Sequence, residues 1–505
     1  MESKLRSRRQ VMKDCARLAA GAVVAGIACR EDAMALQLQL PPPVPLEDPS
    51  LTFVTTTEAS AWQTGKMFKP RFSWDTLNLN VDPADSALTV RTANTMKGFG
   101  GCFNERGWTS LQALSDADRE AVLHALFDPT AGARFTYCRT PIGANDFATE
   151  AYSYDESDGD FELKNFSIEH DKQTLIPFIH AAQRYQPNLR LWASPWSPPS
   201  WMKRNHFYAE AQSFPGMKEN GIRPEQVGHE GEDMFILEPN YLQAYAKYFG
   251  RYVDAYRAEG IRISMVMPQN EFNSAQNFPS CTWTPEGLVN FLKLLGPEMQ
   301  KRDVEVFFGT LERGDPKLLE RVMADAGAAR FVKGIGLQWA GKNALPAIER
   351  QFPALLIYQS EQECGDGSNN WRYTGYCWQL MKHYFRSGAC AYMYWNISTG
   401  DPTSTWGWPQ NSLVSVDTAA KTFRYNHDYY LLKHLTHFVD VGSRRLETTG
   451  TCDDALAFAN PDGSVVLLVR NELPHPQMVQ VQVRERAAVL ELPPDSVGTL
   501  AMKPA

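Results

Sequence analysis

The sequence lacks the residue spacings that usually bind a metal ion. None of its nine cysteines forms a CxxC pair, and none of its ten histidines belongs to an HExxH motif. Zinc sites usually place two ligands at such short spacing. The sequence therefore predicts neither a metal site nor a cofactor.

The cysteine content also excludes a disulfide framework. Seven cysteines, from Cys102 to Cys452, follow the first 35 residues, and an odd number without paired spacing is not typical of a disulfide-rich protein. We expect most of them to be small buried hydrophobic side chains, although Cys364 and Cys377 could pair.

The N-terminal apolar run is too short to span a membrane. It extends from Leu18 to Ala28, well below the roughly 18 residues that a spanning helix needs. It follows Arg8-Arg9 and precedes Ala33-Met34-Ala35, a small-x-small cleavage site. This order resembles a twin-arginine signal peptide over residues 1–35. It predicts export to the periplasm or the extracellular medium, without stable membrane insertion of the mature chain.

Two other interpretations of this segment stay open. The apolar run could instead be an N-terminal membrane anchor. Cys29 could be a lipid attachment site, although the leucine usually found three residues before such a cysteine is absent.

Positive charge is not in excess. The formal net charge is −8, and removal of residues 1–35 leaves 43 basic against 54 acidic residues, a net charge of −11. Such a surface argues against a nucleic-acid partner.

Aromatic residues, in contrast, are abundant, with 13 Trp, 19 Tyr and 26 Phe. Exposed indole rings commonly stack on sugar rings, so a carbohydrate or glycoconjugate is the expected partner.

The two ends of the mature chain are predicted to form one β-sandwich. After a proline-rich linker over residues 36–50, the segment 51–93 contains short alternating runs such as 51–54 and 87–91, which predict strands. Residues 438–505 contain further predicted strands, at 444–449, 455–459, 465–469, 479–483 and 488–492.

Between these segments, residues 94–437 alternate short apolar runs with helical patterns such as 241–258 and 285–302. Eight such units predict an α/β fold, a (β/α)8 TIM barrel. The predicted barrel strands are 98–103, 134–139, 189–194, 263–268, 304–309, 332–339, 355–359 and 391–395.

Two predicted strands of this barrel end in a glutamate. Asn270-Glu271 follows the fourth strand and Ser360-Glu361 follows the seventh, and residues at the C-terminal ends of barrel strands form the active site. Hydrolysis of a glycosidic bond requires one carboxylic acid to protonate the leaving oxygen and one carboxylate to stabilise or trap the oxocarbenium-like sugar. Other strand ends supply polar or aromatic side chains, namely Glu105, Asp146, Trp196, Gln338, Trp339 and Trp395.

Six stretches at these strand ends resemble glycoside hydrolase family 30, which contains glucosylceramidase. They lie within roughly residues 95–500, and their order and spacing make the resemblance specific. They are 97–101 (KGFGG), 193–203 (ASPWSPPSWMK), 270–271 (NE), 334–339 (GIGLQW), 359–361 (QSE) and 394–396 (YWN).

The resemblance implies that Glu271 is the general acid/base and Glu361 the nucleophile of a retaining double displacement. It also implies a first sugar subsite formed by Glu105, Asp146, Trp196, Asn270, Trp339 and Trp395. Three positions depart from the glucosylceramidase pattern. Asn104-Glu105 replaces Thr-Asp, Gln338 replaces His, and Phe272 replaces Pro. These departures leave the identity of the sugar open, but not the reaction.

Glu363 is a rival for the role of nucleophile, because it alternates in phase with Glu361 and both could face the site. The position of Glu361 directly after the apolar run 355–358 favours Glu361.

We therefore expect an exported retaining β-glycosidase acting on β-linked glucosides, fucosides, xylosides or short β-glucans. A lipid substrate such as glucosylceramide would require an apolar groove that these loops do not specify. A carboxyl separation of about 5–5.5 Å fits retention, whereas about 6.5–9.5 Å fits an inverting enzyme with the same residues. A non-catalytic carbohydrate-binding barrel is the third alternative, and the sequence leaves the oligomeric state open.

Overall fold

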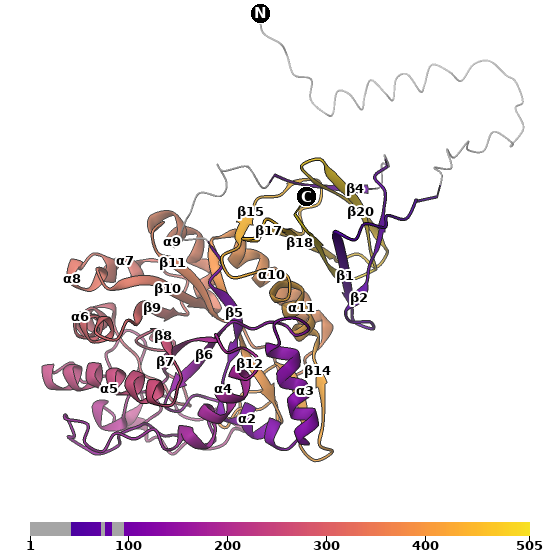
Figure 1. Cartoon of the computed structure of the whole chain (residues 1–505). Helices are drawn as coiled ribbons and strands as arrows, with labels where there is room; N and C mark the ends of the chain where they lie inside the picture. Colours follow the sequence, from indigo (N-terminus) through magenta and orange to yellow (C-terminus); the bar gives the residue numbers. More distant parts are fainter. Residues whose placement is uncertain (1–41, 72–75, 83–94, 505) are drawn as a thin grey trace, which may run out of the picture. The chain divides into compact units, whose positions relative to one another are not determined.

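Eight parallel strands close into a barrel in the computed structural model, which describes residues 42–71, 76–82 and 95–504 (Figure 1). Each strand pairs with the next, and the β11–β12 and β12–β5 pairings close the ring. The predicted TIM barrel is thus confirmed. The barrel strands are β5 (Gly98–Cys102), β6 (Tyr137–Ile142), β7 (Arg190–Pro195), β8 (Ile263–Val266), β9 (Glu305–Leu311), β10 (Val332–Gln338), β11 (Leu356–Glu361) and β12 (Ala389–Thr399).

The second barrel strand begins later than predicted, at Tyr137 rather than Arg134. Arg134 has a φ of 57°, in the left-handed region, so the chain turns there before the strand can begin. The shift places Arg139 in the middle of β6, where it is fully buried. Because the strand begins later, Arg139 lies inside it rather than at its end.

Helices surround the barrel and bury apolar faces against it. In α5 (Pro239–Ala258), Tyr245, Tyr248, Tyr252 and Tyr256 recur at three- or four-residue spacing and are fully buried. The remaining α-helices are α2 (Glu105–Gln112), α3 (Asp116–Phe127), α4 (Leu175–Gln183), α6 (Pro285–Gln300), α7 (Lys317–Met323), α8 (Ala326–Ala329), α9 (Leu345–Gln351), α10 (Trp371–Arg386) and α11 (His427–Thr436).

A β-sandwich packs its two sheets around a separate apolar core. One sheet has the order β15-β17-β18-β21-β1-β2 and the other β16-β4-β19-β20-β3. Because β1 pairs with β21 and β4 pairs with β19, the first and last parts of the described chain build this sandwich together, as predicted. Its strands are β1 (Leu51–Thr57), β2 (Gln63–Thr64), β3 (Lys66–Phe68), β4 (Thr76–Val81), β15 (Arg444–Leu446), β16 (Thr449–Gly450), β17 (Ala455–Ala459), β18 (Val465–Asn471), β19 (Gln477–Val483), β20 (Arg486–Leu492) and β21 (Ser496–Met502).

Several strands of the described residues were not predicted individually from the sequence, among them β21, β13 and β14. β21 lies at the centre of the first sandwich sheet, and β13 (Ser412–Asp417) and β14 (Thr422–Tyr425) extend the barrel sheet beyond β12. The predicted signal peptide, residues 1–35, and the predicted strand 87–91 lie outside the described residues.

His434 on α11 joins the barrel to the sandwich. Its two ring nitrogens lie 2.9 Å from Thr499 Oγ1 and 2.8 Å from Thr56 Oγ1, on β21 and β1. Burial lowers the pKa of His434 to about 3, so the ring is neutral in this interface.

Candidate active site

A cavity of about 460 Å³ opens among the loops that follow the barrel strands. Glu271 and Glu361 both line it, so the fold brings together the two glutamates that the sequence places ninety residues apart. The lining residues are Asp146, Trp196, Phe214, Asn270, Glu271, Gln276, Phe278, Trp339, Glu361, Cys364, Gly365, Trp408, Pro409 and Gln410.

Glu361, the last residue of β11, forms a buried ion pair with Arg139. Nη1 of Arg139 lies 2.5 Å from Oε2 of Glu361, and the Arg139 side chain is fully buried. The guanidinium carbon also lies 4.2 Å from the centre of the Trp196 ring and 4.8 Å from that of Trp192. Aromatic faces attract a cation, so these rings help to hold Arg139 away from water.

Glu271 has a different hydrogen-bond partner. Nε2 of Gln338 donates to Oε1 of Glu271 at 3.0 Å, and Gln338 in turn accepts a hydrogen bond from Ser360 Oγ. The backbone of Glu271 has a φ of 47°, and its N–H donates to Thr310 Oγ1 at 2.9 Å. The acid/base candidate is therefore held in a left-handed conformation by the neighbouring strand β9.

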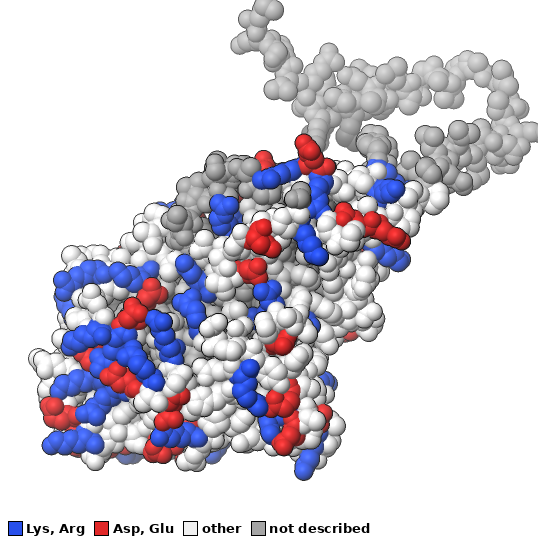
Figure 2. Space-filling view, viewed as in Figure 1, with Lys and Arg blue, Asp and Glu red and all other residues white. Residues whose placement is uncertain are grey.

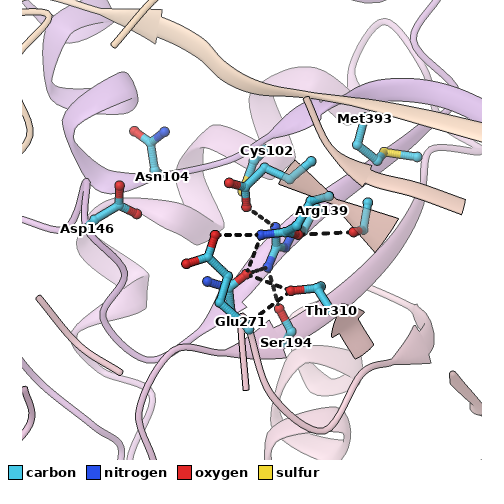
Figure 3. Close-up of polar contacts among 12 residues, drawn as sticks. Cys102, Asn104, Arg139, Asp146, Ser194, Glu271, Thr310 and Met393 are labelled. Atoms are coloured by element: carbon cyan, nitrogen blue, oxygen red, sulfur yellow. Dashed lines mark hydrogen bonds and ion pairs between the residues drawn. The ribbon is translucent and has the colours of Figure 1, made fainter. Parts of the chain in front are cut away.

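The amide oxygen of Asn270 connects these groups. Oδ1 accepts hydrogen bonds from Arg139 Nη2 at 2.8 Å, Thr310 Oγ1 at 3.1 Å and Gln338 Nε2 at 3.3 Å. Arg139 also donates to Ser194 Oγ, and Figure 3 shows its guanidinium among Glu271, Ser194 and Thr310. Because the Asn270 oxygen is occupied by protein donors, its NH2 group is the end available to a ligand.

Burial favours the protonated form of both glutamates. Burial raises the pKa of Glu271, and the hydrogen bond from Gln338 and the charge of Arg139 oppose the rise. Burial, together with the charges of Glu271 and Asp146, also raises the pKa of Glu361, while the adjacent guanidinium of Arg139 opposes the rise. The pair therefore holds a proton near neutral pH. Since Glu361 contacts a guanidinium and Glu271 contacts a neutral amide, the proton is more stable on Glu271.

A strand-end cavity with two buried carboxyl groups is the architecture of many barrel hydrolases, and a family model identifies which. The model described as "Glycosyl hydrolase family 30 TIM-barrel domain" matches residues 96–439, and the corresponding β-sandwich model matches residues 442–500. The chain belongs to glycosyl hydrolase family 30. It is therefore a glycoside hydrolase, and the family resemblance seen in the sequence is confirmed.

Relatives of this family 30 enzyme are named for different activities. The chain is 29% identical to the lysosomal acid glucosylceramidase of Mus musculus over 74% of its own length and 75% of the relative. It is 26% identical to an endo-1,6-β-D-glucanase of Neurospora crassa over 81% of its own length and 84% of the relative. Among solved structures, SrfJ from Salmonella typhimurium matches with a TM-score of 0.77 and 21% identity, covering 90% of this chain and 100% of that chain.

The predicted sugar-binding residues of this hydrolase differ in their position relative to the cavity. Asp146, Trp196, Asn270 and Trp339 line the cavity with the two glutamates. Gln338 lies just outside the lining and contacts Glu271. Trp395 is buried behind Trp196, with the two ring centres 5.4 Å apart.

Glu105 does not line this cavity, and its predicted place in the first subsite stays a prediction. It begins helix α2, and its carboxylate is turned away to Thr174 Oγ1 at 2.9 Å, His170 Nε2 at 2.8 Å and the backbone N–H of Thr149 at 3.0 Å. Glu105 is absent from the lining of the cavity. Its position at a strand end was visible in the sequence, but the direction set by the helix start was not.

Glu363 also points elsewhere. Its carboxylate accepts hydrogen bonds from Lys342 Nζ at 2.5 Å and Tyr376 Oη at 2.7 Å, and it does not line the cavity. Strand β11 ends at Glu361, so the alternation that made Glu363 a rival does not continue. Cys364 and Cys377 are both free, and no disulfide joins them.

Sequence reasoning missed several residues of the site, among them Arg139, Gln410 and Phe214. Arg139 is a cation in the middle of an otherwise uncharged strand, which is a signal because a buried charge needs a partner. Gln410 donates to Asp146 Oδ2 at 3.3 Å, and Phe214 lines the cavity from a long loop after β7. Neither of these two has a sequence signal.

Among residues 42–71, 76–82 and 95–504, no group of three His, Cys, Asp or Glu side chains could hold a metal ion. No helix in the same ranges is long and apolar enough to cross a membrane.

Proposed function

We propose that the enzyme is a retaining β-glycosidase in which Glu361 is the nucleophile and Glu271 the general acid/base. The observation that carries this assignment is the difference between their partners. Glu361 contacts the buried guanidinium of Arg139 at 2.5 Å, whereas Glu271 contacts the neutral amide of Gln338 at 3.0 Å. A cation stabilises the ionised form that a nucleophile needs, and a desolvated carboxyl keeps the proton that an acid must donate.

The reaction then has two steps. Oε1 or Oε2 of Glu361 attacks the anomeric carbon while Glu271 gives its proton to the leaving oxygen, which breaks the glycosidic bond and forms a glycosyl ester on Glu361. Glu271, now ionised, takes a proton from water, and the hydroxyl attacks the same carbon to release the sugar and free Glu361. The configuration at the anomeric carbon is inverted twice and therefore retained.

The cavity offers matching groups for the sugar hydroxyls. The free NH2 group of Asn270 can donate to the 2-hydroxyl, and the carboxyl of Asp146 can accept from hydroxyls farther along the ring. Burial raises the pKa of Asp146 to about 7, and bound hydroxyl donors would lower that pKa by stabilising the carboxylate. Trp196 and Trp339 provide apolar walls.

We propose β-linked glucosides, fucosides, xylosides or β-glucan oligomers as substrates. The glucosylceramidase and endo-1,6-glucanase relatives support a β-glucoside first, and they leave a glucosylceramide-like lipid as one candidate. A soluble glycan fits the three aromatic side chains Phe214, Trp339 and Trp408, which line the cavity beside the polar Gln276 and Gln410. On the face shown in Figure 2, charges of both signs are interspersed over the barrel helices, which gives no continuous basic surface for nucleic acid.

The experiment is hydrolysis of a p-nitrophenyl β-glycoside panel with glucose, galactose, fucose and xylose donors, followed by proton NMR of the first product. We expect turnover of the glucoside with a β-configured product. An α-configured first product would instead establish an inverting enzyme, and no turnover with any donor would favour a carbohydrate-binding barrel.

We further propose export by the N-terminal segment, which cell fractionation of the full chain and of an Arg8-Arg9 to Lys-Lys variant would test.

A further inference from the structure

A further buried carboxyl group lies near Glu271, outside the lining of the cavity. Glu312 directly follows β9, is 2% exposed, and is absent from the cavity lining. Neither the sequence pattern nor the proposed reaction assigns it a role. A buried carboxyl group is costly unless its oxygens are used, so its contacts need an explanation.

One oxygen of Glu312 holds the turn that begins at Glu271. Oε1 accepts hydrogen bonds from the backbone N–H of Asn273 at 2.8 Å and from Ser274 Oγ at 2.9 Å. The turn itself is closed by the N–H of Ser274, which donates to the carbonyl of Glu271 at 2.9 Å. Glu312 is thus tied to both residues that complete the turn of the acid/base.

Thr310, near the end of β9, forms hydrogen bonds with the other side of the turn that begins at Glu271. The N–H of Thr310 donates to the carbonyl of Gln269 at 2.6 Å, and Thr310 Oγ1 accepts from the N–H of Glu271. Glu271 has a φ of 47°, which a non-glycine residue rarely adopts without such support. Hydrogen bonds of Thr310 and Glu312 therefore fix the backbone on both sides of Glu271.

The other oxygen of Glu312 indicates its charge state. Oε2 is buried and has no hydrogen-bond partner among the described residues. The charged groups that face Glu312 are Glu271, which repels it, and Arg313, whose Nη1 lies 3.8 Å from Oε1. Arg313 is shared with Glu230, to which it donates two hydrogen bonds at 3.0 Å. Burial and the charge of Glu271 raise the pKa of Glu312 to about 8, which favours the neutral carboxylic acid at neutral pH.

We propose that Glu312 is a positioning residue for the acid/base: as a neutral acid it fixes the turn from Glu271 to Ser274 through Oε1, and it adds no second negative charge beside Glu271. The proposal rests on the acid/base role proposed above for Glu271. A carboxylate in this place would repel ionised Glu271 after proton transfer, and an apolar side chain would release the turn.

The test compares two leaving groups on the sugar that the wild-type enzyme hydrolyses fastest. An alkyl β-glycoside needs a proton from Glu271, whereas a 2,4-dinitrophenyl β-glycoside leaves without one, so kcat/KM for the second does not depend on acid placement. We expect Glu312→Ala to lower kcat/KM at least about 100-fold for the alkyl glycoside and less than about 5-fold for the dinitrophenyl glycoside. Glu312→Gln keeps Oε1 and neutrality, and it should stay within about 5-fold of wild type for both.

Controls separate this role from a general loss of structure. Glu230→Gln makes the same chemical change at the other partner of Arg313, away from the turn, and should leave both rates unchanged. If Glu312→Ala does not fold, Ser274→Ala removes one bond of the turn and should slow only the alkyl glycoside, by about 5-fold or more. Equal losses for both leaving groups, no loss for either, or a Glu312→Gln variant as slow as Glu312→Ala would overturn the proposal.

Glu271→Ala distinguishes the two levels of inference. If that variant loses activity without any dependence on the leaving group, the acid/base assignment itself fails. If kcat/KM of Glu271→Ala depends on the leaving group and that of the Glu312 and Ser274 variants does not, only the proposed role of Glu312 fails.

Discussion

The Nη1 atom of Arg139 lies 2.5 Å from the Oε2 atom of Glu361, in a site where both side chains are buried. The same guanidinium also donates to Ser194 and Asn270. One side chain from β6 therefore contacts groups at the C-terminal ends of β7 and β11 and just after β8. In a buried ion pair the loss of one partner leaves the other charge uncompensated, which makes this contact sensitive to substitution.

Arg139→Lys should lower kcat/KM by about 100-fold or more, because lysine keeps a charge but lacks the planar guanidinium whose spaced donors reach Glu361, Ser194 and Asn270. Arg139→Met should also move the acidic limb of the kcat/KM pH profile upward. The reason is that Arg139 lowers the pKa of Glu361, so its removal raises the pH at which Glu361 ionises. The matched control is Arg134→Met at the turn before β6, where Arg134 pairs with Asp440, and an unshifted Arg139→Met profile would contradict the role.

Glu361→Ala should reduce turnover by at least about 10⁴-fold, because no covalent intermediate can form. Added azide should restore turnover and give the α-glycosyl azide, since azide would attack the open face once. Glu271→Ala with azide should give the β-glycosyl azide instead, because the glycosyl ester still forms. Product NMR reads both outcomes. Rescue in Glu363→Ala and not in Glu361→Ala would transfer the nucleophile assignment to Glu363.

Gln338→Leu should move the alkaline limb of the kcat/KM profile to higher pH by about 0.5–1 unit. The amide of Gln338 donates to Glu271 and lowers its pKa, so removing the donor lets the acid keep its proton to higher pH. The alkaline limb of kcat/KM reports the acid of the free enzyme, which makes the profile the appropriate measurement. A limb that moves to lower pH would show that Gln338 does not act on Glu271 in this way.

His434→Gln should make the free energy of unfolding less dependent on pH in the acidic range. In the folded protein the pKa of His434 is lowered from 6.5 to about 3, so the unfolded chain binds a proton that the folded one excludes. The stabilising contribution is complete above pH 6.5 and is lost as pH falls below it, by about 1.4 kcal/mol per pH unit until about pH 3.

Denaturant titrations at pH 7 and pH 5 measure this effect as the change in free energy of unfolding between the two. We expect the wild-type change to exceed that of His434→Gln by about 2 kcal/mol. His475→Gln, on an exposed turn, is the control and should behave like wild type. Equal changes in His434→Gln and wild type would mean that His434 is not the group that titrates.

The sequence by itself determined the barrel, the sandwich and the position of both glutamates along the chain. The reason is local: strand and helix patterns follow from hydrophobic periodicity, and Asn270-Glu271 and Ser360-Glu361 each directly follow an apolar run. Closure of the ring also follows from strand order, since unpaired edges are unfavourable. The pairing of β1 with β21 became visible only in the structure, because β21 was not predicted.

Only the tertiary structure decided which polar side chains face the cavity. Glu105 and Glu271 both stand at strand ends, yet Glu105 turns to His170 while Glu271 turns to Gln338. Direction depends on φ at a single residue and on donors from distant strands, and no period in the sequence encodes either. For the same reason the partners of Arg139, and the place of Glu312 beside the turn of Glu271, became visible only in the folded barrel.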